Sequence, residues 1–116
     1  MNPPSTAANP ELKPPYYAVI FSSLRDEKPD DGYATAADRM VELASEQDGF
    51  LGIASTRDPS GLGITVSYWR DLNAIQNWRR QEEHLVAQSR GRSHWYRSYS
   101  VEVCLVQRQY DRERPG

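Results

Sequence analysis

The apolar stretch YYAVIFSSL, residues 16–24, constrains the fold more than any other part of the sequence. It is rich in β-branched and aromatic residues, and it lies between a proline and the charged run RDEKPDDG. A short run of this kind with clear ends predicts a strand. Because the stretch is apolar on nearly all of its positions, we expect the strand to lie in the middle of a sheet.

The segments that follow predict a helix and then a hairpin. Asp30 or Asp31 can cap a helix that runs to about Gln47, since apolar residues recur there at helical spacing and Asp-Gly follows. The stretches FLGIASTR and LGITVSYW flank the turn sequence DPSG. Residues 50–69 therefore predict an antiparallel hairpin.

The last third of the chain predicts a second helix and a fourth strand. Asp71 is expected to cap the helix. The stretch SYSVEVCLVQRQY, residues 98–110, alternates apolar and polar residues for much of its length, which is typical of a strand.

The second helix carries an acidic residue where an apolar one would be expected. A continuous helix over residues 71–90 would bury a stripe formed by Ile75, Trp78 and Val86, and Glu82 would fall in its middle. Burying an unpaired carboxylate costs on the order of several kcal/mol. We therefore predict a break in the helix between Arg80 and Glu82, with a new helix beginning at EEHLVAQ.

The resulting order of elements is β-α-β-β-α-β, the split βαβ pattern of an α+β ferredoxin-like domain. Two helices should cover one face of a four-stranded antiparallel sheet and leave the other, largely apolar face uncovered. The sequence thus predicts a homodimer whose sheets face each other, a dimeric α/β-barrel-like assembly. The domain should span residues 16–110, between a flexible N-terminal tail, residues 1–15, and a C-terminal tail, residues 111–116.

Composition narrows the classes of partner and site. A net charge of -2 and the lack of a recognised motif argue against nucleic-acid binding. No apolar run approaches the ~20 residues that span a bilayer and no secretory signal begins the chain, so we expect a cytoplasmic protein without membrane contact. The single cysteine, Cys104, and the two histidines do not form a metal-ligand pattern, so no metal is predicted.

Candidate site residues lie on the second helix. His84 and Gln88 are one helical turn apart, at the border between the apolar and polar sides. Both side chains could point into a cavity between the helices and the sheet. His84 could equally be a surface or structural residue.

Three motifs of the chain resemble the antibiotic biosynthesis monooxygenase (ABM) superfamily. These motifs are VSYWRDLNAIQNW, EEHLVAQSRGR and WYRSYSVEV. The resemblance covers about residues 16–110 and is greatest to small single-domain bacterial members described as haem-degrading-monooxygenase-like. It implies a dimeric ferredoxin-like fold with a pocket between helices and sheet. Members oxidise polycyclic aromatic compounds or quinols, or degrade haem, commonly without a separate flavin or metal.

The resemblance carries over to the residues of this chain only in part. Trp78 matches a tryptophan that haem-degrading members use. Their strand asparagine falls in IFSSL, which offers Ser22 or Ser23, and their iron-ligating histidine falls at or near Gln88, one turn after His84.

This departure leaves His84 as the candidate base. It could remove a proton from a phenol or an activated carbon, so that the resulting anion can pass an electron to O2. Gln88, Ser22 or an arginine would stabilise the anion, and Trp69 and Trp78 would wall the pocket.

The sequence therefore predicts a cofactor-independent monooxygenase that acts on an aromatic or quinol-like small molecule. Two alternatives stay open. One is a haem-binding or haem-degrading monooxygenase with His84 as the axial ligand, and the other is a non-catalytic small-molecule-binding dimer of the same fold.

Overall fold

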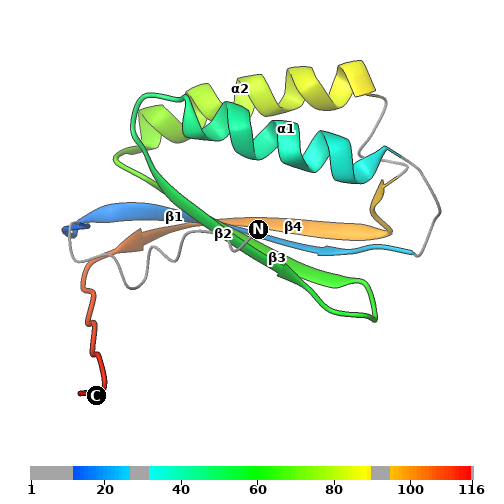
Figure 1. The fold of residues 1–116 in the computed structure, drawn as a ribbon. Coiled ribbons are helices and arrows are strands. Elements are labelled where there is room, and N and C mark those ends of the chain that lie inside the picture. Colours follow the sequence, from blue (N-terminus) through cyan, green and yellow to red (C-terminus); the bar gives the residue numbers. More distant parts are fainter. Residues whose placement is uncertain (1–11, 27–31, 90–94, 116) are drawn as a thin grey trace.

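A computed structural model describes residues 12–26, 32–89 and 95–115, and of residues 87–89 it describes the backbone alone. Its helices and strands follow the predicted β-α-β-β-α-β order (Figure 1). Most of the predicted N-terminal tail lies outside the described residues, so the division into a domain and two tails stays a prediction. The elements are β1 (Tyr16–Leu24), α1 (Tyr33–Ser45), β2 (Phe50–Arg57), β3 (Leu62–Trp69), α2 (Leu72–Ser89) and β4 (Ser98–Val106).

The four strands form one antiparallel sheet in the order β2-β3-β1-β4. The apolar strand β1 lies between β3 and β4, as its sequence predicts. Both helices pack on the same face of the sheet (Figure 1). This arrangement is the ferredoxin-like fold, and it makes the space between helices and sheet the natural place for a site.

The two helices begin differently, one with a side-chain cap and the other with a glycine. The carboxylate of Asp71 accepts a hydrogen bond from the backbone N–H of Ala74 at 2.8 Å, which confirms the predicted cap of α2. At the start of α1, Gly32 has a positive φ of 79° and no side chain caps the helix. Asp30 and Asp31, the predicted caps of α1, lie outside the described residues.

The predicted break in the second helix is wrong, because α2 is one continuous helix from Leu72 to Ser89. The apolar stripe of α2 does not pack against protein along its whole length, because part of it borders a cavity. Glu82 does lie on the inner side of the helix, but it borders a cavity and is only half-buried. The carboxylate therefore avoids the cost of complete enclosure by apolar side chains.

The core lies where both helices meet β3. Trp69 is 0% exposed, stacks on Trp78 with 6.0 Å between ring centroids, and donates a hydrogen bond through Nε1 to Ser67 Oγ at 2.9 Å. Ala44 and Ala74 are buried in the same cluster. Their small side chains leave room for the two large indole rings.

Apolar side chains remain exposed along the edge strand β4. These side chains are Tyr99 (46% exposed), Val101 (41%), Val103 (45%) and Leu105 (48%). In the register with β1 they lie opposite Ser23, Phe21, Val19 and Tyr17, respectively, on the helix side of the sheet. The helices leave this edge of the sheet uncovered. The single chain therefore exposes an apolar row of the kind that a partner covers. Neither helix, among the residues that the structure covers, is long and apolar enough to cross a membrane.

Candidate functional site

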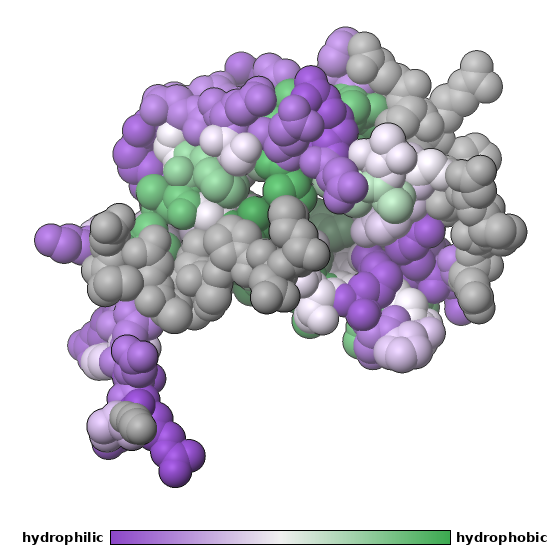
Figure 2. All heavy atoms as spheres, in the orientation of Figure 1, coloured by the Kyte–Doolittle hydropathy of each residue, from purple (hydrophilic) through white to green (hydrophobic). Residues whose placement is uncertain are grey.

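A cavity of about 150 Å³ lies between the two helices and the sheet. Figure 2 shows hydrophobic side chains gathered in this region, beneath the polar outer surface of the helices. Most of the lining is apolar or aromatic, with a few polar groups, as in ligand-binding pockets generally. The lining residues are Val19, Phe21, Tyr33, Ala37, Met40, Val41, Ile53, Ser55, Thr65, Ser67, Ile75, Trp78, Arg79, Glu82, Val86, Trp95, Tyr96 and Val101.

Glu82 is the functional candidate that the sequence interpretation missed. The α2 residues of the lining, from Ile75 through Trp78 and Glu82 to Val86, recur at three- and four-residue spacing and so share one face of the helix. Glu82 is the carboxylate among the described residues that line the cavity. The sequence carries this signal as an acid within an apolar stripe, from which the sequence analysis predicts a broken helix instead of a functional carboxylate.

His84 lies on another side of α2. Two residues along a helix correspond to a rotation of about 200°, so a side chain at position 84 points away from the direction of Glu82. His84 is accordingly exposed and is not among the lining residues. The expectation that its imidazole faces the cavity is wrong for this chain, and its role as a base stays a prediction. The side chain of Gln88 lies outside the described part of the chain.

The other predicted contacts divide between the cavity, the core and the opposite face. Trp78 lines the cavity, as predicted. Trp69 does not line the cavity, because its side chain is fully enclosed in the core. Ser22 is not in the lining either: Phe21 and Val19 line the cavity, and successive strand residues point to opposite faces. Trp95 also lines the cavity, although the sequence analysis assigns it no role in the site.

Two tyrosines and an arginine form a hydrogen-bonded group at one part of the lining. Tyr33, from the first turn of α1, and Tyr96, from the segment before β4, both line the cavity and are hydrogen-bonded to each other. Arg57, at the end of β2, donates from Nη2 to the hydroxyl oxygen of Tyr33 at 3.3 Å. The Arg25 guanidinium carbon lies 3.6 Å from the centroid of the Tyr33 ring.

The electrostatics of this group keep Tyr96 in its neutral form. Burial raises the pKa of Tyr96, and its hydrogen bond to Tyr33 raises the pKa further. The positive charges of Arg57 and Arg25 act in the opposite direction without outweighing these effects. The Tyr96 hydroxyl is therefore protonated at neutral pH, and its O–H is donated to Tyr33.

The geometry gives little support to a haem or metal site. A volume of about 150 Å³ compares with engineered cavities that hold a benzene ring, far smaller than a haem. The candidate axial ligand, His84, is exposed and does not border the cavity. Within residues 12–26, 32–89 and 95–115, no group of three or more histidine, cysteine or acidic side chains is placed to hold a metal ion.

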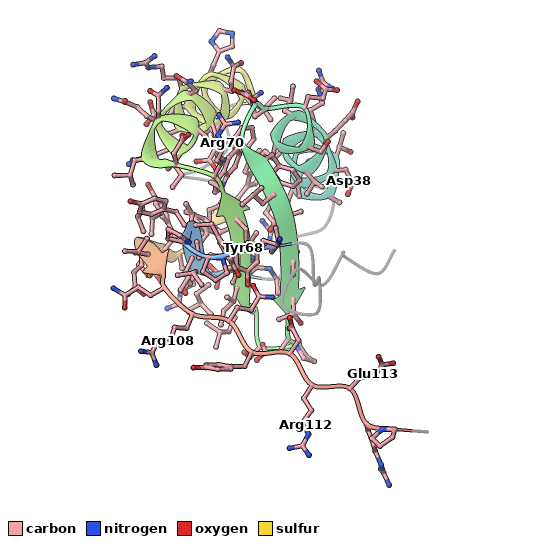
Figure 3. The ribbon with its side chains drawn as sticks, turned by 90° about the vertical axis from the view of Figure 1, so that its left-hand side faces the viewer. Asp38, Tyr68, Arg70, Arg108, Arg112 and Glu113 are labelled. Carbon is pink, nitrogen blue, oxygen red and sulfur yellow. The ribbon has the colours of Figure 1, made fainter. Side chains whose placement is uncertain are left out.

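Arg70 forms ion pairs that lie outside the cavity. Arg70 forms a bidentate pair with Asp48, with N–O distances of 3.2 and 3.0 Å, and a 3.0 Å contact with Asp71. Its guanidinium holds the pKa of the Asp48 carboxyl below the usual range. Figure 3 shows Arg70 beside the helix layer, whereas Arg108 and Arg112 lie on the extended C-terminal segment. These arginines are separate from the cavity lining.

Comparison with known proteins agrees with this fold. A sequence model of the family described as antibiotic biosynthesis monooxygenase matches residues 15–90. The uncharacterised protein YqjZ of Bacillus subtilis (strain 168) is 56% identical over 97 residues, which cover 84% of each chain. A jasmonate monooxygenase of Pyricularia oryzae is 29% identical over 92 residues, covering 78% of this chain and 43% of that protein.

A solved structure of SnoaB, described as a cofactor-independent oxygenase from Streptomyces nogalater, superposes with a TM-score of 0.68. The match covers 86% of this chain and 100% of that chain at 12% identity, so it speaks for the fold alone. The fold, the cavity between helices and sheet, and the extent of the family match lead to one conclusion. The chain belongs to the antibiotic biosynthesis monooxygenase family.

Proposed function

We propose that this protein is a cofactor-independent monooxygenase that oxidises a small aromatic or quinol-like molecule. The observation that carries the proposal is the cavity itself, which is lined by aromatic rings and, among the described residues, by the Glu82 carboxylate, the Arg79 guanidinium and a tyrosine pair. An apolar pocket with a few convergent polar groups is the usual form of a small-molecule site. The family membership and the name of the jasmonate monooxygenase relative support the same reaction class.

The proposed reaction begins with removal of a proton from an activated C–H or O–H bond of the substrate. The resulting anion passes one electron to O2, giving a substrate radical and superoxide. These combine to form a C–O bond, and with a proton the product is a hydroperoxide. Loss of water then leaves a carbonyl, so one oxygen atom of O2 enters the product and the other leaves as water. The substrate supplies all the electrons, and the protein supplies proton transfer and charge stabilisation.

We assign the proton transfer to Glu82. Its carboxylate lines the cavity on α2, on the same helix face as Trp78. His84, the base expected from the sequence, would need to reach substrate from the exposed side of the helix. Geometry is the first requirement for a general base, because it must lie within hydrogen-bond reach of the proton.

The cavity favours a substrate of modest size. Its volume of about 150 Å³ suits one aromatic ring more readily than a polycyclic system. The relative from Pyricularia oryzae is named a jasmonate monooxygenase, which supports a small organic substrate for this chain also.

Filling the cavity should abolish turnover. In the variant Ala37→Phe, a ring would occupy the space that substrate needs, since Ala37 lines the cavity. We expect oxygen consumption with model quinols, without added metal or flavin, to fall to background. Ala34→Phe is the matched control, because Ala34 lies on the same helix but is exposed. Aromatic binding without oxygen consumption in the unmodified protein would instead favour the non-catalytic binding dimer.

We also propose that the protein is a homodimer formed through its sheets. Leu62 (49% exposed) and Ile64 (42% exposed) support this assembly, because they alternate along β3 with the cavity-lining Thr65 and Ser67 and so lie on the sheet face away from the helices. Ile64→Arg should therefore shift the sedimentation coefficient from that of a dimer to that of a monomer. Leu72→Arg is the matched control, because Leu72 is an exposed apolar residue on α2, and this variant should remain a dimer. A monomer in the unmodified protein would contradict the proposal. The cytoplasmic location expected from the sequence stays a prediction.

A further inference from the structure

We propose that the substrate of this protein carries a carboxylate, which binds the guanidinium of Arg79 at the mouth of the cavity while the ring of the substrate lies inside. This inference rests on the proposed function and adds to it the chemical class of the substrate and its orientation. It follows from a positively charged side chain that borders the cavity and has no anionic partner among the described residues.

Arg79 lies at the mouth of the cavity. Its side chain lines the cavity and is also exposed to solvent, whereas the neighbouring Trp78 lines the cavity and is only 7% exposed. Successive residues of a helix are rotated by about 100°, so Trp78 points inward and Arg79 lies at the border of the same face. A ring that packs against Trp78 thus brings its outward-facing substituent to Arg79.

The guanidinium of Arg79 has its hydrogen-bond donors available. Within the described part of the chain it forms no hydrogen bond and no ion pair. Glu82 and Glu83 follow it by three and four residues, the spacings at which opposite charges pair along a helix. At the same three-residue spacing on α1, Arg39 and Glu42 do pair, with 3.0 Å between Nη1 and Oε1. Arg79 is therefore left to bind an anion from outside the chain.

Two other arginines close to the cavity are already held by the protein. Arg57 donates to the hydroxyl oxygens of Ser23 and Tyr33, at 2.6 and 3.3 Å. The guanidinium carbon of Arg25 lies 3.6 Å from the centroid of the Tyr33 ring. Neither of these arginines lines the cavity. Among the described residues, Arg79 is thus the guanidinium that a ligand in the cavity can reach.

A carboxylate fits this position better than a group of higher charge. A guanidinium can form two parallel hydrogen bonds to a carboxylate. Glu82 also lines the cavity, one helical turn from Arg79, and it repels further negative charge there. One guanidinium balances the single charge of a carboxylate, whereas a phosphate of about −2 would leave an excess negative charge beside Glu82.

The size and polarity of the cavity place the carboxylate at its mouth. The volume of about 150 Å³ is close to that of a cavity that holds one aromatic ring. The lining away from α2 has no charged side chain among the described residues, and burying an unpaired carboxylate there would be costly. At the mouth, both Arg79 and water reach the charged group. The expected substrate is therefore an aromatic acid of one ring.

The test compares gentisate, a quinol that carries a carboxylate on its ring, with its methyl ester, which has the same ring and no charge. Equilibrium dialysis with the full-length protein in the absence of oxygen measures the binding of each ligand and prevents turnover. We expect gentisate to bind about tenfold more tightly than the ester, because a hydrogen bond to a charged group contributes that much. Arg79→Gln should remove this preference and leave the affinity for the ester unchanged.

Two controls separate a charge effect from a packing effect. Arg80→Gln is the matched variant, because Arg80 is an exposed arginine on the same helix that does not line the cavity, and it should keep the full preference. Added salt should weaken the binding of gentisate to the unmodified protein far more than that of the ester, since salt screens exposed charges. A packing role of the Arg79 side chain would instead change the binding of both ligands alike.

Each outcome bears on the inference. A preference for gentisate that is lost in Arg79→Gln and kept in Arg80→Gln supports it. Equal binding of gentisate and its ester, failure of both to bind, or a preference that survives Arg79→Gln overturns it. Because binding is measured without turnover, the proposed function is tested separately, by oxygen consumption with quinols that have no carboxylate.

Discussion

Replacing Trp69 with alanine is expected to destabilise the fold by about 3–5 kcal/mol, the range typical of removing a large aromatic side chain from a core. Trp69 is 0% exposed, and its ring contacts Phe50 and Trp78. Its removal would leave a void and would also leave the Ser67 hydroxyl without the indole N–H that it accepts from at 2.9 Å. Since small domains have total stabilities of about 5–15 kcal/mol, much of the folded population could be lost.

Denaturant unfolding followed by tryptophan fluorescence and far-ultraviolet circular dichroism measures this effect. Tyr110→Ala serves as the matched control, because Tyr110 is an aromatic residue that is 83% exposed, and its loss should hardly move the unfolding midpoint. A Trp69→Ala protein that unfolds at the same denaturant concentration as the unmodified chain would show that the core does not centre on this residue.

Replacing Glu82 with glutamine is expected to reduce oxygenase turnover by about 10²–10⁴-fold, the usual contribution of a positioned general base. Glutamine keeps the size of the side chain and removes its ability to take a proton. Oxygen uptake with a model quinol, measured at saturating quinol, reports the loss in kcat. The quinol's own binding should change little, because the apolar lining is intact.

Two neighbouring residues on α2 provide the controls. Glu83→Gln removes an exposed carboxylate one position further along, and His84→Gln removes the base expected from the sequence. Both variants should turn over at close to the unmodified rate. If His84→Gln loses activity while Glu82→Gln retains it, the assignment of the base reverses and the histidine must reach substrate by a route other than this cavity.

The helix that carries these residues shows where sequence reasoning succeeded and where it failed. Helical spacing correctly placed Glu82 in the same stripe as Ile75, Trp78 and Val86. The conclusion drawn from that placement, a break in the helix, was wrong because the stripe faces a cavity over part of its length. Periodicity identifies the inner face of a helix, but it does not tell whether that face meets packed side chains or open space.

By itself, the sequence determined the strands and helices, their order, the central place of β1, the cap at Asp71 and the membership of the family. These features depend on local patterns of apolar residues and on short motifs, which act within one element or one turn. Tertiary structure alone decided that Glu82 borders the cavity, that His84 faces solvent, and that Arg57 lies behind two tyrosines. Those relations join segments far apart in the chain, and they depend on how the elements pack in three dimensions, a property that no single segment encodes.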